Sequence, residues 1–293
     1  MMMNTLYRYT ILVLLLVLAN GLQAQGPWPQ GKGNGYFKLS EWWIRFDEHY
    51  TDTGDKDPNL TTGVYNTSIY AEYGLTDRLT GVVNLPFFSR TTMNNLISET
   101  TGAVLVEGEA LNGLGDAELG LKYTLTQDGA GLPIALSLTF GLPLGEDQGG
   151  SQGNLQLGDG EFNQLLMAHI GSSFQLGNAN AYWSAILGVN NRTNNFSDEL
   201  RYGLEAGVNL AQDRLLLVGR LRGLSSFMNG ETAATATSTG LFANNIEFLT
   251  LGGEANFFLT EKLGLSLGLA SPLSGRIYAV GTSYSAGVFL QIR

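Results

Sequence analysis

The sequence contains no cysteine, and it has only two histidines, His49 and His169. A chain without thiols has no disulfide framework, no thiolate metal site and no cysteine nucleophile. The interactions that stabilise this fold are therefore non-covalent.

Basic residues are also scarce, because 16 lysines and arginines stand against 26 aspartates and glutamates, which gives a formal net charge of −10. Nucleic-acid binding requires clustered Lys and Arg that displace counterions from phosphates, and the chain contains no basic run. We therefore expect no nucleic-acid partner, whereas sugars, small solutes and cations are compatible with this charge.

Long apolar runs are missing as well. After residue 35 no apolar segment approaches the roughly 18 residues that a membrane-spanning helix needs. Near the start, Arg8 precedes an apolar run at 11–19, and Gln23-Ala24-Gln25 then offers a small-residue cleavage point. Such a run is too short to span a bilayer about 30 Å thick, so it predicts a signal peptide over 1–24, followed by one domain over 25–293.

Regular alternation of apolar and polar residues is the dominant pattern in the remaining chain. Ala117, Leu119, Leu121 and Tyr123 alternate with Asp116, Glu118, Gly120 and Lys122, which is the period of a β-strand with one apolar face. Counting such segments predicts twelve strands, at 36–49, 63–74, 78–89, 115–125, 133–143, 161–175, 181–190, 199–210, 214–225, 245–258, 263–271 and 282–292.

The connections between these segments alternate between short turns and longer loops. The short ones lie at 74–77, 127–131, 177–180, 211–213 and 260–262, and the first four contain Gly, Asn or Asp, which favour tight turns. Short periplasmic turns and longer extracellular loops are typical of single-chain barrels in Gram-negative outer membranes. The sequence therefore predicts an all-β fold, an antiparallel transmembrane β-barrel of about twelve strands in the cell outer membrane, closed by pairing of its first and last strands.

A soluble β-sandwich or lipocalin-like barrel would also show alternating strands. The membrane is favoured because one face is rich in leucine, whereas the other carries Gly, Ser, Asn and charges that could not fill a dry core. Aromatic residues also gather near the predicted strand ends, at Trp42, Trp43, Phe46, Phe87, Phe88, Tyr123, Trp183, Phe257 and Tyr284. We therefore expect outer-membrane lipids, lipopolysaccharide and the barrel-assembly machinery as partners, together with a small-molecule solute.

Four strings of residues carry a resemblance to a known family: 73–80 (YGLTDRLT), 85–88 (LPFF), 115–123 (GDAELGLKY) and 141–145 (GLPLG). They resemble outer-membrane transporter-like barrels grouped with the phenol-degradation meta-pathway proteins. The resemblance is clearest from the second predicted strand to the fifth. It implies a passive conduit for small solutes such as hydrophobic or aromatic compounds, with no catalytic motif and no cofactor.

If the leucine-rich face meets lipid, the charged residues of the other face line the lumen. The lumen-lining candidates are Glu72, Arg78, Glu118, Lys122, Arg201, Glu205, Arg220, Arg222 and Glu254. The turn at 211–213 predicts an ion pair between Glu205 and Arg220, or Arg222 after a two-residue slip. The turn at 74–77 places Glu72 near Arg78 or Thr80, and Arg220 and Arg222 are the best candidates for a constriction.

Loops and one strand irregularity add further expectations. The loop at 89–113 contains Val104-Leu105-Val106 and either folds inward to narrow the mouth or remains a surface loop. The acidic, glycine-rich loop at 145–160 does not have the spacing of a calcium-binding loop, so we expect no metal site there. Near Ser40 a bulge is expected, because Phe37 and Leu39 are out of phase with Trp42.

Two other functions are compatible with a barrel. One is a non-transporting structural or binding barrel of the envelope, with a plugged lumen. The other is an outer-membrane lipid hydrolase, which needs a base within reach of a serine hydroxyl. His169 is expected on the lumen side of its strand, but Ser172 falls on the opposite face and Ser173 too far along, so a serine partner would have to come from another strand. We therefore do not expect an enzyme.

Overall fold

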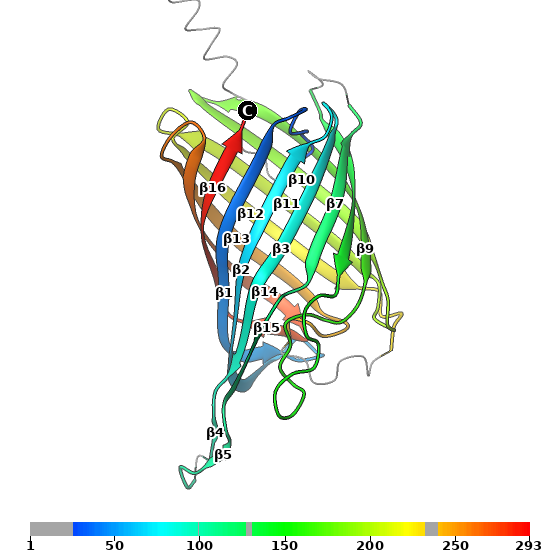
Figure 1. Cartoon of the computed structure of the whole chain (residues 1–293), viewed down its shortest axis with the longest axis vertical. Coiled ribbons are helices and arrows are strands. Elements are labelled where there is room, and N and C mark those ends of the chain that lie inside the picture. The colour runs from blue at the N-terminus through cyan, green and yellow to red at the C-terminus, as the bar shows by residue number, and fades with distance from the viewer. Residues whose placement is uncertain (1–25, 99, 127–130, 232–239) are drawn as a thin grey trace, which may run out of the picture.

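The computed structural model describes residues 26–98, 100–126, 131–231 and 240–293, and these form an antiparallel barrel (Figure 1). The expected signal peptide lies outside the described residues, as does most of the expected turn at 127–131. In the described part of the chain, no helix is long and apolar enough to cross a membrane.

The strand segments follow one another around the barrel in sequence order. They are β1 (Gly35–Tyr50), β2 (Lys56–Gly74), β3 (Leu79–Met93), β4 (Leu96–Ile97), β5 (Val104–Val106), β6 (Glu109–Gly113), β7 (Ala117–Thr124), β8 (Ile134–Leu142), β9 (Asn163–Leu176), β10 (Ala179–Arg192), β11 (Glu199–Leu210), β12 (Leu215–Ser226), β13 (Glu247–Phe258), β14 (Leu263–Arg276), β15 (Tyr278–Val280) and β16 (Ser283–Ile292). The small β4–β5 pair is a separate sheet. Since β6 continues into β7 along β3, and β15 into β16 along β1, the remaining segments form twelve strands, as the sequence predicts.

Closure depends on β1, which pairs with β2 on one side and with β16 on the other. The second pairing runs from Gly35 opposite Ile292 to Ile44 opposite Ser283. A closed sheet leaves no edge strand with unpaired backbone groups, and this is the condition for crossing a bilayer with strands. The predicted pairing of the first and last strands is confirmed.

The strand boundaries differ from the predicted ones mainly at the long-loop end of the barrel. There β2 begins at Lys56, β3 extends to Met93 and β14 to Arg276. The predicted bulge near Ser40 is wrong, because the register between β1 and β2 is continuous from Gly35 to Phe46. The out-of-phase pattern arises because both faces of β1 are apolar.

Inward-facing Ile44 and Phe46 form a buried cluster, and Trp42 packs against it. Trp42 and Phe46 therefore do not belong to an aromatic girdle on the exterior of the barrel, which is where we expected them. On the other face, Leu39 is exposed and Trp43 stacks on Tyr284, with ring centroids 5.8 Å apart. The inward and outward faces of β1 thus carry similar apolar residues although one face meets the lumen and the other meets lipid.

The outer surface carries the leucine-rich face, with Leu204 55% exposed and Leu267 66% exposed. One exception is Glu41 on β1, which faces outward and whose carboxylate accepts a hydrogen bond of 2.5 Å from the hydroxyl of Thr67 on β2. Apart from such local departures, the exterior has the composition expected of a lipid-facing wall.

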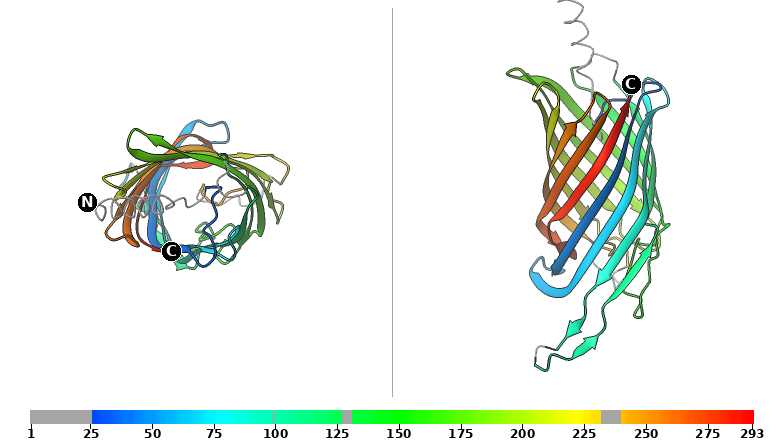
Figure 2. Two further views of the ribbon diagram at one scale, coloured as in Figure 1. Left: turned by 90° about the horizontal axis from the view of Figure 1, so that it is seen from above. Right: turned by 60° about the vertical axis from the view of Figure 1, so that its left-hand side comes forward.

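The two ends of the barrel differ in shape. The C-terminus and the short turns lie at one end, whereas the β4–β5 hairpin projects far beyond the other (Figure 1 and Figure 2). Of the two alternatives for loop 89–113, the structure therefore shows the surface loop and not the inward fold. Val104–Val106 belongs to this hairpin, and Leu105 is 62% exposed because β5 pairs only with β4.

Replacing Leu204 by arginine tests the lipid-facing assignment. We expect Leu204→Arg to destabilise the barrel in liposomes by about 2–4 kcal/mol, the penalty for a cation near the middle of the lipid-facing surface. Leu105→Arg, at an equally exposed leucine of the β4–β5 hairpin, is the control and should have little effect. Urea unfolding in liposomes measures both, and equal stabilities would contradict a lipid-facing Leu204.

Candidate functional site

The lumen contains a cavity of about 480 Å³, whose lining includes Glu72 and Lys122 as well as Asp159 and Arg192 near the long loops. Charged residues from β2, β7, β10, β11 and β12 form much of its wall, whereas Phe242, Ile246, Phe248 and Tyr278 form an apolar side. The rings of Phe248 and Tyr278 lie 4.6 Å apart, which fixes the orientation of both rings at the edge of the cavity. The cavity therefore offers both charge and apolar surface to a small molecule.

A chain of ion pairs joins side chains of β1, β11, β12 and β13 on the inner wall, and we call it the wall ladder: Lys38, Glu254, Arg220, Glu205 and Arg222. Arg220 lies between the two carboxylates, with its Nε 2.6 Å from Glu205 and its Nη1 3.1 Å from Glu254. Lys38 extends the ladder to Glu254 at 3.4 Å, and Arg222 to Glu205 at 3.4 Å.

Strand register explains the centre of the ladder. Glu205 on β11 is directly opposite Arg220 on β12, so the predicted cross-strand ion pair is confirmed. Arg222 also contacts Glu205, so the two pairings predicted as alternatives coexist. The hydroxyl of Tyr182 donates a further hydrogen bond of 2.9 Å to Glu205, which holds this carboxylate from a third strand.

Of the two neighbours expected for Glu72, Arg78 is wrong, because it lies in the turn before β3, outside the cavity. Glu72 lies opposite Val82, two residues from Thr80, and Gln30 donates hydrogen bonds to both Glu72 and Thr80. The turn consumes more residues than a tight hairpin would, so Gly74 already pairs with Thr80 and Arg78 never enters the wall. Glu72 instead pairs with Lys122 at 3.2 Å, and their side chains are 1% and 3% exposed.

Residues 26–34 lie inside the barrel at the short-turn end, and we call this segment the plug (Figure 2). Lys122 donates a hydrogen bond to the carbonyl of Gly26 at 3.1 Å, and the hydroxyl of Thr124 donates one to the carbonyl of Pro27 at 3.0 Å. Gln30 donates to Glu72 at 2.9 Å. The Glu72–Lys122 pair therefore anchors the plug and also borders the cavity.

Trp28 fixes the plug to a different part of the wall. Its ring meets Tyr182 of β10 edge-on, with centroids 5.8 Å apart, and packs against a buried cluster that includes Leu216 and Val218 of β12. Close backbone contact secures the other end, because a Cβ on Gly74 would come within 1.7 Å of the Gly31 carbonyl oxygen. The plug thus contacts walls on both sides of the lumen.

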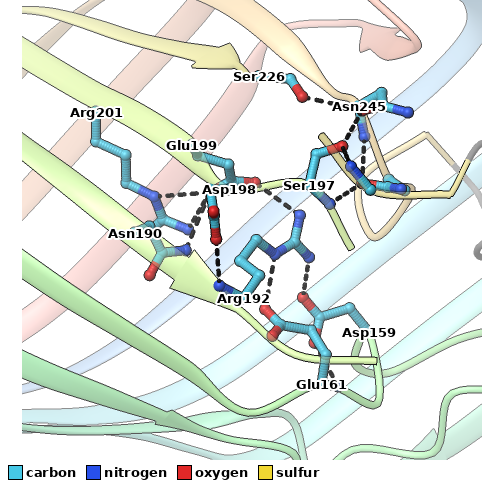
Figure 3. Close-up of polar contacts among 12 residues, drawn as sticks. Asp159, Glu161, Asn190, Arg192, Ser197, Asp198, Glu199, Arg201, Ser226 and Asn245 are labelled. Carbon is cyan, nitrogen blue, oxygen red and sulfur yellow. Dashed lines mark hydrogen bonds and ion pairs between the residues drawn. The ribbon is translucent and has the colours of Figure 1, made fainter. Parts of the chain in front are cut away.

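At the long-loop end, a cluster of charges centred on Arg192 joins three connecting segments (Figure 3). The guanidinium of Arg192 contacts Asp159 at 2.8 Å, Glu161 at 2.7 Å and Glu199 at 2.7 Å. Nearby, the backbone N–H of Ser197 donates to the side chain of Asn244 at 2.8 Å, which joins the β10–β11 loop to the segment before β13.

Acidic groups outnumber basic ones in this loop cluster. Burial raises the pKa of Asp159 to about 6. The positive charge of Arg192 opposes this rise, and the repulsion from Asp116 adds to it. Burial also raises the pKa values of Asp116 and Glu161. These carboxyl groups therefore retain protons at a higher pH in the folded protein than in the unfolded chain.

The two histidines occupy different places. His169 faces the cavity, with its Nε2 2.8 Å from the hydroxyl of Ser137 on the neighbouring strand β8. This is a cross-strand serine partner, but it lies inside the lumen and not on a lipid-facing rim. His49 is at the long-loop end of β1. The described residues contain no group of His, Cys, Asp and Glu that could hold a metal ion.

Eight of the nine lumen candidates face the interior. Five line the cavity: Glu72, Glu118, Lys122, Arg201 and Arg222; Glu205, Arg220 and Glu254 belong to the wall ladder. Residues that the sequence did not reveal are Lys38, Asp159, Glu161, Arg192, Glu199 and the plug. Alternation on β1 could have identified Lys38, but the loop residues show no periodic pattern.

Comparison with known protein families and with curated protein sequences gave no match. Among solved structures, the fold is similar to an outer-membrane channel from Pseudomonas putida F1, with 18% identity over 93% of this chain and 100% of that one and a TM-score of 0.64. The β domain of the Bordetella autotransporter BrkA has 15% identity over 89% and 100% of the chains and a TM-score of 0.49. The first similarity supports the barrel fold.

We expect the loop cluster to be more stable at pH 5 than at pH 7.5. Because the folded pKa of Asp159 is raised to about 6, the resulting stabilisation is complete below the unfolded value near 3.9 and is lost as the pH rises through about 6. Protease cleavage in loops 143–162 and 193–198 should therefore be slower at pH 5, measured with a protease active at both values. Asp159→Asn should weaken this pH dependence, and an unchanged dependence would contradict the assignment.

Proposed function

We propose that this protein is an outer-membrane channel through which small solutes pass down their concentration gradient. The observation that carries the proposal is a closed twelve-stranded barrel whose exterior is leucine-rich and whose interior is charged and holds a cavity of about 480 Å³. Barrels of this strand number are wide enough for a narrow pore or a modest cavity. The similar fold of the Pseudomonas putida channel supports a channel for this chain.

The orientation follows from the connections. The short turns and the plug are assigned to the periplasm, and the long loops with the Arg192 cluster are assigned to the cell exterior. A solute would therefore enter between the outer loops, occupy the cavity and leave past the plug.

Small hydrophobic or aromatic compounds are the favoured solutes. The apolar side of the cavity, formed by residues such as Phe242 and Phe248, provides a surface for an aromatic ring. The resemblance of residues 73–80 and 115–123 to the phenol-degradation barrels points to the same class of compound. The plug also favours a second function, a binding barrel that retains its ligand, because it covers the short-turn end of the lumen.

Single-channel conductance in planar bilayers tests the proposal. Discrete current steps with the refolded protein would support a channel, and a folded but silent barrel would favour the binding function. Trp28→Ala should increase the conductance, because Trp28 holds the plug against Tyr182 and the β12 wall. Trp43→Ala, which removes an outward-facing tryptophan, is the matched control and should leave the conductance unchanged. Equal effects of the two variants would contradict a plug held by Trp28.

Ion selectivity tests the wall ladder. Arg220→Gln removes the cation shared by Glu205 and Glu254, so the lumen becomes more negative and the reversal potential should shift toward cation selectivity. The double variant Arg220→Gln with Glu205→Gln restores the net charge and should return the selectivity toward that of the original protein. If neither variant changes the reversal potential, Arg220 does not border the ion path.

A further inference from the structure

Glu118 differs from the other acidic side chains that line the cavity. Of the described carboxylates there, Glu72 pairs with Lys122, Asp159 with Arg192, and Glu199 with Arg192 and Arg201. Glu118 forms no ion pair with any residue that the structure describes. It is exposed to the cavity and accepts one hydrogen bond, 3.3 Å long, from the neutral side-chain amide of Asn84 on β3.

The cation nearest to it along β7 is already engaged elsewhere. Lys122, four residues further on the same face of β7, directs its ammonium to Glu72 and to the Gly26 carbonyl, and its side chain is 3% exposed. Tyr70 on β2 likewise donates its hydroxyl hydrogen to Glu72, at 2.5 Å. Within the described residues the Glu118 carboxylate is therefore left without a cationic partner, and it is exposed to the cavity.

Apolar side chains occupy other parts of the same cavity. Leu165 and Met167 of β9 and Ile186 of β10 contribute to its lining, together with Phe248. Pockets of a few hundred Å³ that combine apolar walls with one or two placed polar groups are typical of small-molecule sites. A hydrated metal ion would use Glu118 but not this apolar surface.

We propose that the cavity binds a small amphipathic cation, whose protonated primary amine donates hydrogen bonds to the Glu118 carboxylate while its apolar part packs against Met167 and Ile186. This inference rests on the proposed function, since it names the solute class that the same lumen accepts. Ammonium–carboxylate hydrogen bonds are stronger than neutral ones, and they gain further where water is partly excluded. An anionic analogue is repelled by Glu118, and a neutral one gains only the apolar contact.

The test compares three ligands of similar size and different charge: 2-phenylethylamine, 2-phenylethanol and 3-phenylpropanoate. Binding to the refolded protein is measured by isothermal titration calorimetry in detergent, with empty micelles as the blank. The amine should bind about tenfold more tightly than the alcohol, which corresponds to about 1.4 kcal/mol, and the carboxylate most weakly. Equal binding of amine and alcohol would overturn the proposal.

Variants show whether Glu118 is responsible. Glu118→Gln keeps the size and the acceptor for Asn84, and it should bring the amine and alcohol affinities within about twofold of each other. Glu107→Gln, at an exposed acid outside the strands, is the matched control and should retain the tenfold preference. Retention of the preference in Glu118→Gln would overturn the proposal.

A second substitution keeps the test decisive if Glu118→Gln does not fold, which gel migration of unheated samples would reveal. Asn84→Lys places a cation directly across from Glu118 and should abolish the amine preference with Glu118 still present. Conductance and ligand binding together distinguish failure of the channel function from failure of this inference. A protein that binds the amine preferentially but shows no conductance contradicts only the channel, whereas conductance without amine preference contradicts only this inference.

Discussion

Pairing of every backbone N–H and C=O group within the wall is the constraint on which the rest of this structure depends. Water is absent from the hydrocarbon layer, so an unpaired group there would cost several kcal/mol. β1 meets the constraint by pairing with β2 and β16 at once, over an unbroken register from Gly35 to Ile44. Register in turn fixes which side chains face inward, because a slip of one residue would turn every side chain to the opposite face.

Closure also sets the chemistry of the lumen. Charged side chains that cannot face lipid gather inside, and removing one partner of a buried pair is strongly destabilising. The structure meets this requirement with shared cations. Arg220 serves Glu205 and Glu254, and Arg192 serves three carboxylates. Glu118 is an exception to this sharing of cations, because it is exposed to the cavity and has no cationic partner among the described residues.

Sequence alone predicted the features that depend on local pattern. Period-two alternation located the twelve strands, and the turn at 211–213 was short enough to give the register that pairs Glu205 with Arg220. The same reasoning failed for Arg78, because the β2–β3 turn leaves that residue outside the paired strands. The inference depended on the number of residues between the paired strand ends, which is four from Leu210 to Leu215 and five from Gly74 to Thr80.

Contacts between distant segments were beyond the reach of sequence patterns. The plug residues have no periodicity, and Lys122 reaches Gly26 across 96 positions of the chain. Arg192 ends a strand whose alternation was predicted, but two of its carboxylate partners, Asp159 and Glu161, come from the β8–β9 loop and the third, Glu199, begins the next strand. Such contacts depend on how a loop packs against the ends of neighbouring strands, which no single segment encodes.

The plug at one end of the lumen and the loop cluster at the other are held by interactions of different kinds. The two ends therefore respond differently to a change of pH. Apart from its bonds to the Glu72–Lys122 pair and to the carboxylate of Asp77, the plug is held by hydrogen bonds of main-chain, amide and hydroxyl groups and by the packing of Trp28. The loop cluster contains an excess of carboxyl groups, and that of Asp159 titrates near pH 6. We therefore expect a change of pH through about 6 to act on the loop cluster more than on the plug.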